Sequence, residues 1–411
     1  MGIITTLTIG AALAAPVAGS GGAVLRHALI VGANDGGEGL EPLRYAVSDA
    51  GRVEEVLTEL GGFDRDRVTV LDSPDRDELE AALRKHGTMA RGSEQDLFLF
   101  YYSGHADARG LRLGEELLPF ADLKQQIRDL PAEVRLGVLD ACRSGEITRI
   151  KGFKLTEPFA TEDSLSAEGE AWLTATAADE EAQESDRLRG SFFTHYLVSG
   201  LRGAADGGGD ESGDGVVSLV EAYDYAFDRT VARTGNTSAG TQHPGYDFRL
   251  QGQGDLPLTD VSKASARLVL PAELSGEITV IRLPEAIPVA EVAKAPGRPL
   301  DVALRPGRYQ LRAHGPEGTG EAVINLSEGS VLHARDFRAV PDELAMAKGG
   351  DDGRGAPVVA APLAGRPTRP EPRDEMDALA TPPPAPELDD FESVREVGRQ
   401  FVDSLRSTAT A

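Results

Sequence analysis

The stretch Leu97-Phe98-Leu99-Phe100-Tyr101-Tyr102-Ser103-Gly104-His105-Ala106-Asp107 runs from an apolar segment into a glycine and a histidine. The stretch Leu136-Gly137-Val138-Leu139-Asp140-Ala141-Cys142-Arg143-Ser144-Gly145 runs in the same way into a cysteine. Each apolar run has the length and composition of a buried strand. The carboxyl ends of parallel strands in an open α/β sheet lie at one edge, where ligands bind. We therefore expect His105 and Cys142 to face one crevice.

A cysteine beside a histidine provides a nucleophile and its base. A thiol is mostly protonated at neutral pH, and an imidazole at hydrogen-bond distance can take its proton and later return it to a leaving amine. The alternative is that Cys142 is an inert buried thiol and His105 a core histidine. The pair of strand-end motifs favours the nucleophile.

The motifs Tyr102-Ser103-Gly104-His105 and Asp140-Ala141-Cys142-Arg143-Ser144-Gly145 together resemble those of the caspase-like clan of cysteine peptidases. The similarity is greatest to the metacaspase and orthocaspase branch, with a bacterial type of organisation, and covers roughly residues 25–258. The resemblance implies that Cys142 is the nucleophile and His105 the general base and acid. It also implies an oxyanion hole formed by the backbone amides of Gly104 and Cys142.

The same resemblance implies an acidic pocket for the residue that precedes the scissile bond. The matching positions are Asp140, two residues before the cysteine, and Asp49 in the first helix, with Ser103 near the mouth. Two carboxylates bind a guanidinium and repel an acidic side chain, which predicts cleavage after Arg or Lys. Two alternatives stay open. Asp49 faces water, or Arg44 and Arg143 line a pocket that accepts Asp.

Strands and helices alternate over the first 260 residues, which predicts a caspase-like α/β domain with a mostly parallel sheet flanked by helices. The glycine-rich loop 32–39 lacks the phosphate-binding fingerprints, so a nucleotide site is not expected. His195 lies on a predicted helix and is expected to be structural, since one base is already assigned. The expected strands are 28–31, 67–71, 97–103, 136–140, 171–177 and 244–250, and the expected helices are 41–60, 75–89, 122–130 and one that starts at 191.

The sequences of two loops predict regulation of the peptidase, one by self-cleavage and one by calcium binding. The segment 146–168 holds Arg149, Lys151 and Lys154, which would be self-cleavage sites of a protease specific for basic residues; an uncut flexible loop is the alternative. The segment 210–221 follows the calcium-loop template, with a glycine at its sixth position. The residues predicted to bind calcium are Asp210, Ser212, Asp214 and Glu221.

The pattern changes after the α/β domain, which we place at residues 24–260. Short apolar runs between Gly and Pro turns predict a small antiparallel β-sandwich over 264–340, with a role in interaction or spacing. Residues 341–387 are rich in proline and predict a disordered or extended linker. Residues 388–411 carry apolar residues at helical spacing, which predicts an amphipathic helix that docks on a partner or on this chain.

The net charge and the cysteine content argue against several classes of partner and site. The chain has 411 residues, with 67 acidic and 42 basic side chains and a net charge of −25. This balance argues against a nucleic-acid partner and suits a cationic substrate. The one cysteine excludes an intramolecular disulfide, and the Cys and His spacing matches no zinc site.

Residues 1–23 resemble a signal peptide or leader. The apolar run 3–18 is followed by small residues, and Ala12-Leu13-Ala14 is a candidate cleavage site. The basic residues that usually precede such a run are missing, because the first Lys or Arg is Arg26. Export to the periplasm or outside the cell is the prediction, and a cytoplasmic location is the alternative. The run is too short to predict a transmembrane span.

The sequence thus predicts a caspase-like cysteine endopeptidase that cuts proteins or peptides after Arg or Lys. Its chemistry requires no cofactor, and Ca²⁺ is predicted as an activator. The β-sandwich and the C-terminal helix are the expected partner surfaces. The alternative from another class is a non-catalytic scaffold that uses the caspase-like domain to bind partners.

Overall fold

The structure is a computed structural model, and its described residues form two compact units. The first takes its residues from 24–186, 190–194 and 227–256, and the second from 187–189, 195–226 and 257 onward. The described residues are 24–89, 96–142, 144, 168–178, 180–206, 213–235, 237–251, 255–315, 318–334 and 338–340.

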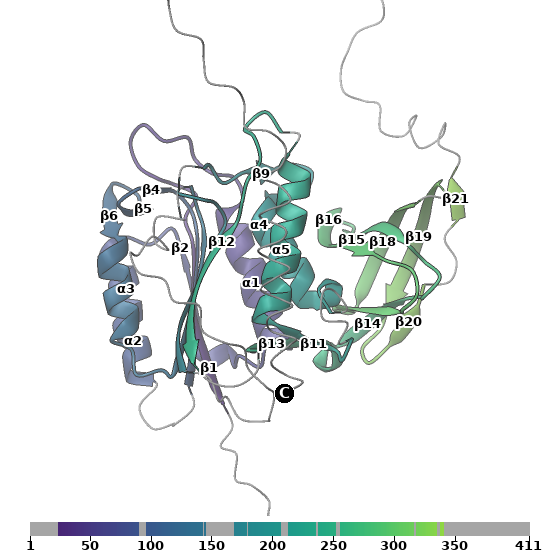
Figure 1. The fold of residues 1–411 in the computed structure, drawn as a ribbon, viewed down its shortest axis with the longest axis horizontal. Coiled ribbons are helices and arrows are strands. Elements are labelled where there is room, and N and C mark those ends of the chain that lie inside the picture. The colour runs from purple at the N-terminus through teal and green to yellow at the C-terminus, as the bar shows by residue number, and fades with distance from the viewer. Residues whose placement is uncertain are drawn as a thin grey trace, which may run out of the picture. The chain divides into compact units, whose positions relative to one another are not determined.

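The first unit is built on a six-stranded sheet in the order β12-β8-β7-β3-β1-β2. All neighbouring strands are parallel except β12, which is antiparallel to β8 (Figure 1). This arrangement confirms the predicted mostly parallel sheet. The strands are β1 (Leu25–Gly32), β2 (Val68–Asp72), β3 (Asp96–Ser103), β7 (Val134–Asp140), β8 (Glu168–Thr174) and β12 (Gly245–Gln251).

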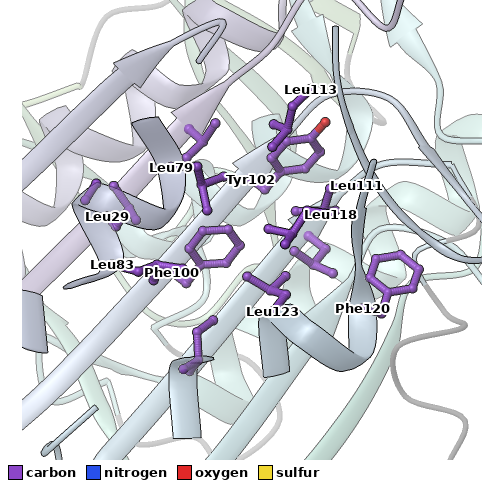
Figure 2. Close-up of a cluster of buried hydrophobic side chains, with 14 of the residues drawn as sticks. Leu29, Leu79, Leu83, Phe100, Tyr102, Leu111, Leu113, Leu118, Phe120 and Leu123 are labelled. Carbon is purple, nitrogen blue, oxygen red and sulfur yellow. The ribbon is translucent and has the colours of Figure 1, made fainter. Parts of the chain in front are cut away.

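Helices cover both faces of this sheet. The helices α2 (Arg76–Met89) and α3 (Phe120–Arg128) lie on one face, and α1 (Ala46–Leu60) lies on the other (Figure 1). Alternate residues of β3 point to the α2 and α3 side, where they join one apolar cluster (Figure 2). Its larger members are Leu29, Leu79, Leu83, Phe98, Phe100, Tyr102, Leu111, Leu113, Leu118, Phe120, Leu123, Ile127, Leu130, Leu139 and Trp172.

The first helix begins five residues later than the sequence predicted, at Ala46 rather than at residue 41. The residue before a proline is disfavoured in the helical region, and Glu41 precedes Pro42. Pro42 therefore disfavours a helical Glu41, and residues 42–45 also lie outside the helix, where the backbone groups of Glu41, Arg44 and Tyr45 form hydrogen bonds with other segments.

Shorter elements complete the chain between the sheet strands. The strands β4, β5 and β6 form a three-stranded antiparallel sheet, and the helix predicted from 191 is confirmed as α4. These elements are η1 (Arg65–Arg67), β4 (Ala106–Asp107), β5 (Gly110–Leu113), β6 (Glu116–Pro119), β9 (Glu184–Ser185), β10 (Gly190–Ser191), α4 (Phe192–Ser199), η3 (Gly200–Ala204), β11 (Val216–Ser218), α5 (Leu219–Thr234), β13 (Pro257–Asp260) and η4 (Val261–Lys263).

The C-terminal part contains two sheets that share one apolar core. Residues of both sheets, such as Leu268 and Val302 on one and Val280 and Leu311 on the other, belong to a single buried cluster. The strands are β17 (Leu300–Leu304), β14 (Ala266–Leu270) and β20 (Val331–His333) in the first sheet, and β16 (Ile287–Lys294), β15 (Gly276–Leu283), β18 (Gly307–Gly315), β19 (Gly318–Leu326) and β21 (Arg338–Val340) in the second.

Two details differ from the antiparallel sandwich predicted for this region. The strand β20 pairs with β14 in parallel, with Val331 to His333 running in the same direction as Arg267 to Val269. The strand β16 was not predicted at all, since Pro288 and Glu291 interrupt its apolar pattern.

Several predicted segments lie outside the described residues. They are the leader 1–23, most of the loop 146–168, the linker 341–387 and the C-terminal helix 388–411. None of the helices in the described ranges is long and apolar enough to cross a membrane.

Two buried histidines contact each other under the N-terminal half of the sheet. The Nδ1 atoms of His27 and His86 lie 3.1 Å apart, and His86 Nε2 lies 3.1 Å from the Thr69 hydroxyl. Burial, with the nearby charge of Arg67, lowers the pKa of His27 to about 4. Burial, with His27 and Lys85, lowers the pKa of His86 to about 3. Both rings are therefore neutral in the folded protein at pH 5.

We expect this histidine pair to destabilise the fold as the pH falls. Below its ordinary pKa of about 6.5, an unfolded histidine binds a proton that the folded ring does not. Each histidine therefore lowers the free energy of unfolding by up to about 1.4 kcal/mol for each unit by which the pH falls. Urea unfolding at pH 5 to 7 should show a shallower loss of stability in His86→Gln than in the wild type. The exposed His333 provides the control, since His333→Gln should retain the wild-type slope. Parallel slopes for all three proteins would contradict this account.

Candidate active site

The pairing of β3 with β7 places the two predicted catalytic residues. The parallel register aligns Ser103 with Asp140. His105 and Cys142 each follow two residues beyond that aligned pair, at the carboxyl end of the sheet. Both residues therefore follow directly after neighbouring strand ends.

The His105 ring is oriented by the loop that precedes α1. Its Nε2 lies 2.9 Å from the backbone oxygen of Glu41. A carbonyl only accepts hydrogen bonds, so Nε2 carries the proton and the lone pair of the neutral ring is on Nδ1. The Tyr102 hydroxyl donates to the His105 carbonyl at 2.7 Å and fixes its backbone. Nδ1 is thus the nitrogen that can accept a proton.

A glycine packs directly against this ring. A β-carbon built on Gly36 would lie 2.4 Å from His105 Cδ2, which is closer than side-chain carbons approach. Only glycine therefore fits at this position without moving the histidine. Neither Gly36 nor Glu41 is predicted as a site residue from the sequence, because the glycine-rich loop 32–39 matches no binding fingerprint and Glu41 belongs to no motif.

Cys142 is half-buried and is the one cysteine of the chain. Burial raises the pKa of its thiol, and the nearby carboxylates of Glu181 and Asp140 act in the same direction. A hydrogen bond from the Ala182 backbone N–H opposes this shift. The resting thiol is therefore protonated at neutral pH, and it needs a base to become a nucleophile.

The predicted oxyanion role of the Gly104 amide is not supported. The Gly104 N–H donates to the carbonyl of Asp140 at 3.2 Å, which extends the β3–β7 pairing by one hydrogen bond. An amide engaged in this way is not free to meet an oxyanion. The amide of Cys142 remains a candidate donor.

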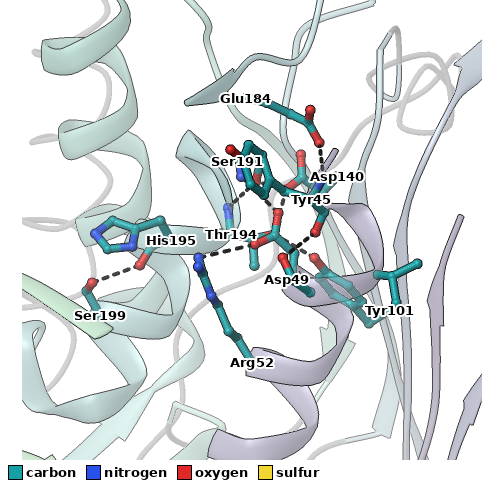
Figure 3. A network of polar contacts seen from close by, with 12 residues as sticks. Tyr45, Asp49, Arg52, Tyr101, Asp140, Glu184, Ser191, Thr194, His195 and Ser199 are labelled. Carbon is teal, nitrogen blue, oxygen red and sulfur yellow. Dashed lines mark hydrogen bonds and ion pairs between the residues drawn. The ribbon is translucent and has the colours of Figure 1, made fainter. Parts of the chain in front are cut away.

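The two predicted pocket aspartates lie together behind the strand ends (Figure 3). Asp49 is 0% exposed and Asp140 is 3% exposed. Ser191 connects them, since its N–H donates to Asp49 at 2.8 Å and its hydroxyl donates to Asp140. The Thr194 hydroxyl donates to the same oxygen of Asp140 at 2.5 Å. The alternative in which Asp49 faces water is therefore wrong. Ser103 is also buried nearby, and its hydroxyl is hydrogen-bonded with Tyr101.

Negative charge in this cluster is only partly compensated. Arg52 pairs with Asp49 at 3.4 Å. Burial nevertheless raises the pKa of Asp49 well above its usual range, and the charge of Asp140 adds to the shift. Burial also raises the pKa of Asp140, against the hydrogen bonds from Ser191 and Thr194. Raised pKa values mean that both carboxylates would be stabilised by a further cation.

A third carboxylate, missed from the sequence as a site residue, lies next to this pair. Glu184 accepts hydrogen bonds from the backbone N–H groups of Arg44 and Tyr45, at 3.0 and 2.9 Å (Figure 3). Its charge contributes to the raised pKa values of Asp49 and Asp140.

The alternative of a basic pocket finds no support in Arg44. Its guanidinium pairs with Asp186 at 3.0 Å, and both side chains are about 70% exposed. This ion pair lies at the surface rather than among the buried carboxylates. Arg143 lies outside the described residues.

The predicted calcium loop is described only from residue 213 onward, so Asp210 and Ser212 lie outside the described residues. Asp214 accepts a hydrogen bond from the Val216 N–H at 2.8 Å. Glu221 and Ser218 form reciprocal side-chain to backbone hydrogen bonds at the start of α5, which is a capping box. The described residues contain no group of three acidic, histidine or cysteine side chains that could hold a metal.

The predicted structural assignment of His195 fits its surroundings. The side chain is 2% exposed, and its Nε2 lies 3.8 Å from a carboxylate oxygen of Glu291. Both residues belong to the second compact unit.

Fold and strand-end geometry together define a caspase-like cysteine peptidase. The chain matches the family model of the caspase domain over residues 25–253, which is more than half of its length, and it therefore belongs to this peptidase family. Among solved structures it is similar to caspase-1 from Spodoptera frugiperda, with 16% identity and a TM-score of 0.41. That match covers 57% of this chain and 89% of the insect protein. No curated protein matches the chain.

The raised pKa of Cys142 predicts its reactivity. We expect the rate of alkylation by iodoacetamide to keep rising with pH beyond about 8.5, the ordinary thiol pKa, because burial disfavours the thiolate. Mass spectrometry reads the reaction at one site, since the chain has one cysteine. The urea-unfolded chain serves as the control, with a midpoint at the ordinary value. A rate already constant at neutral pH would show a preformed thiolate and contradict the expectation.

Proposed function

We propose that this protein is a cysteine endopeptidase that cleaves peptide bonds after Arg or Lys through Cys142 and His105. The observation that supports the specificity is the buried cluster of Asp49 and Asp140, whose pKa values are both raised. The placement of His105 and Cys142 at adjacent strand ends supports the chemistry.

The proposed reaction uses the two side chains as nucleophile and proton carrier. His105 Nδ1 takes the Cys142 proton, and the sulfur attacks the scissile carbonyl carbon, whose oxygen becomes an oxyanion near the Cys142 amide. The carbon–nitrogen bond then breaks, and the imidazolium gives its proton to the leaving amine. Water, deprotonated by His105, hydrolyses the thioester and restores the thiol.

The specificity follows from charge balance. Asp49 has Arg52 as an ion-pair partner, whereas Asp140 is held by two hydroxyls that bring no charge. A guanidinium or ammonium group from a substrate supplies the missing positive charge and lowers both carboxyl pKa values. An acidic side chain would add to the repulsion.

The direct test is hydrolysis of fluorogenic peptides that end in Arg, Lys or Asp. We expect turnover of the Arg and Lys peptides by the wild type and none by Cys142→Ala. Turnover confined to Asp peptides would overturn the pocket assignment. Inactivity on all peptides, together with a Cys142 thiol that ignores an electrophilic peptide probe, would support the non-catalytic scaffold instead.

The pocket assignment predicts a specific loss in Asp140→Asn. We expect its kcat/KM for the Arg peptide to fall at least about tenfold, because one carboxylate charge is lost, while alkylation of Cys142 by iodoacetamide continues. In the wild type, kcat/KM should decrease as the pH falls through the raised carboxyl pKa, since the protonated acid no longer attracts a cation. The exposed Asp186→Asn is the matched control. Equal losses in the two variants would argue against the pocket.

The melting temperature of Asp140→Asn distinguishes the loss of a pocket charge from misfolding of the variant. Asn at position 140 can accept the hydroxyl hydrogen bonds of Ser191 and Thr194 and removes a buried charge. Because its carboxyl pKa is raised in the folded protein, Asp140 costs stability as the pH rises above the ordinary carboxyl pKa. The Asn variant should therefore melt no lower than the wild type at pH 8.

Calcium activation, export and partner binding complete the proposal. The spacing of Asp210, Ser212, Asp214 and Glu221 supports calcium as the activating ion. The peptide assay therefore includes arms with Ca²⁺ and with EDTA, and equal rates in both would exclude this activation. We also propose that residues 1–23 direct export and that the C-terminal β-rich region binds a protein partner.

A further inference from the structure

The strand β16 of the second unit carries a buried carboxylate in an otherwise apolar run. Glu291 is 1% exposed, within the sequence Ile287 to Lys294. Taking a carboxylate out of water costs several kcal/mol unless it is paired and hydrogen-bonded. A buried Glu291 therefore requires ion-pair or hydrogen-bond partners for its carboxylate.

Two partners of the Glu291 carboxylate come from two separate segments. Its Oε2 lies 3.4 Å from Arg187 Nη2 and 3.8 Å from His195 Nε2. Arg187 belongs to the turn between β9 and β10, and His195 belongs to α4. In the same turn, Arg189 donates to the backbone oxygen of Glu285 at 2.9 Å. The turn and the helix are thus attached to one strand.

The backbone of Glu291 is engaged as well. Within the described residues, β16 is an edge strand of its sheet, and β15 is its one neighbour there. On the backbone, the Glu291 N–H donates to Ser199 Oγ at 3.1 Å, and the Tyr225 hydroxyl donates to the Glu291 carbonyl at 2.6 Å. Ser199 in turn donates to the His195 carbonyl at 2.8 Å. These contacts hold residues 195–199 of α4 to β16.

The segments that Glu291 holds are continuous with the aspartate cluster. Arg187 and Arg189 precede Ser191 in the chain, and His195 directly follows Thr194. Ser191 and Thr194 are the residues whose hydroxyls donate to Asp140 (Figure 3). The stretch from 187 to 195 is therefore anchored at both ends by Glu291, with the donors to Asp140 between the anchors.

We propose that Glu291 is a positioning residue for the substrate pocket, which acts through residues 187–195. It holds this stretch so that Ser191 and Thr194 orient the Asp140 carboxylate, and it thereby makes the β-rich region a determinant of specificity. The part of this inference that concerns substrate rests on the proposed function. The part that concerns the stretch 187–195 does not.

The activity test compares Glu291→Gln with Glu285→Gln. Glu285 is an exposed residue of the same region whose side chain makes none of these contacts, so the change in charge is matched. We expect Glu291→Gln to raise KM for the Arg peptide about tenfold with little change in kcat, because the pocket and not the nucleophile is affected. Arg187→Gln should raise KM in the same direction, and the double variant should add little to either single effect. A lowered melting temperature with an unchanged KM would overturn the proposal.

A second measurement does not depend on activity. The Ser191 N–H donates to buried Asp49, so its hydrogen exchange reports the order of the stretch. We expect faster exchange in peptides that cover 187–195 in Glu291→Gln, and wild-type exchange in Glu285→Gln and in peptides from β3. Unchanged exchange in the Glu291 variant would refute the anchoring. Faster exchange in a protein that hydrolyses no peptide would leave the anchoring intact and refute only the proposed function.

Discussion

The parallel pairing of β3 with β7 is the constraint on which the site depends. β3 is buried along its whole length, and its side chains alternate between the two faces of the sheet. A slip of one residue would move Phe100 and Tyr102 out of the apolar cluster beneath α2 and α3, so the register is strongly determined. The same register aligns Ser103 with Asp140 and brings His105 and Cys142 to adjacent strand ends. Core packing thus specifies the geometry of the reactive pair.

Each of the two compact units contains a buried carboxylate whose desolvation opposes folding. Asp140 is surrounded by hydroxyl donors, and Glu291 is paired with groups from a turn and a helix. Such groups do not add stability in proportion to their contacts, because desolvation offsets the attraction. The raised carboxyl pKa values of Asp49 and Asp140, close together near a strand end, are typical of functional sites. The proposed recognition of a cation would offset the cost of burying these two carboxylates.

Much of the fold could be predicted because its signals are local. Apolar runs, helical spacing and glycine turns identified the sheet strands and the helices within a few residues. The start of α1 was misplaced, although Pro42 carried the signal, and β16 was missed because Glu291 breaks the apolar pattern. The Gly104 amide was assigned from a motif, whereas its partner, the Asp140 carbonyl, belongs to another strand.

The sequence by itself determined the family motifs, the strand ends that carry His105 and Cys142, and the candidate aspartates Asp49 and Asp140. Only the tertiary structure decided the tautomer of His105, set by the Glu41 carbonyl, and the burial of Asp49 beside Asp140. It also decided that residues 187–195 are held by Glu291, about 100 residues away in the chain. The physical reason is that hydrogen-bond partners and desolvation depend on which distant segments come into contact, and no local pattern encodes that.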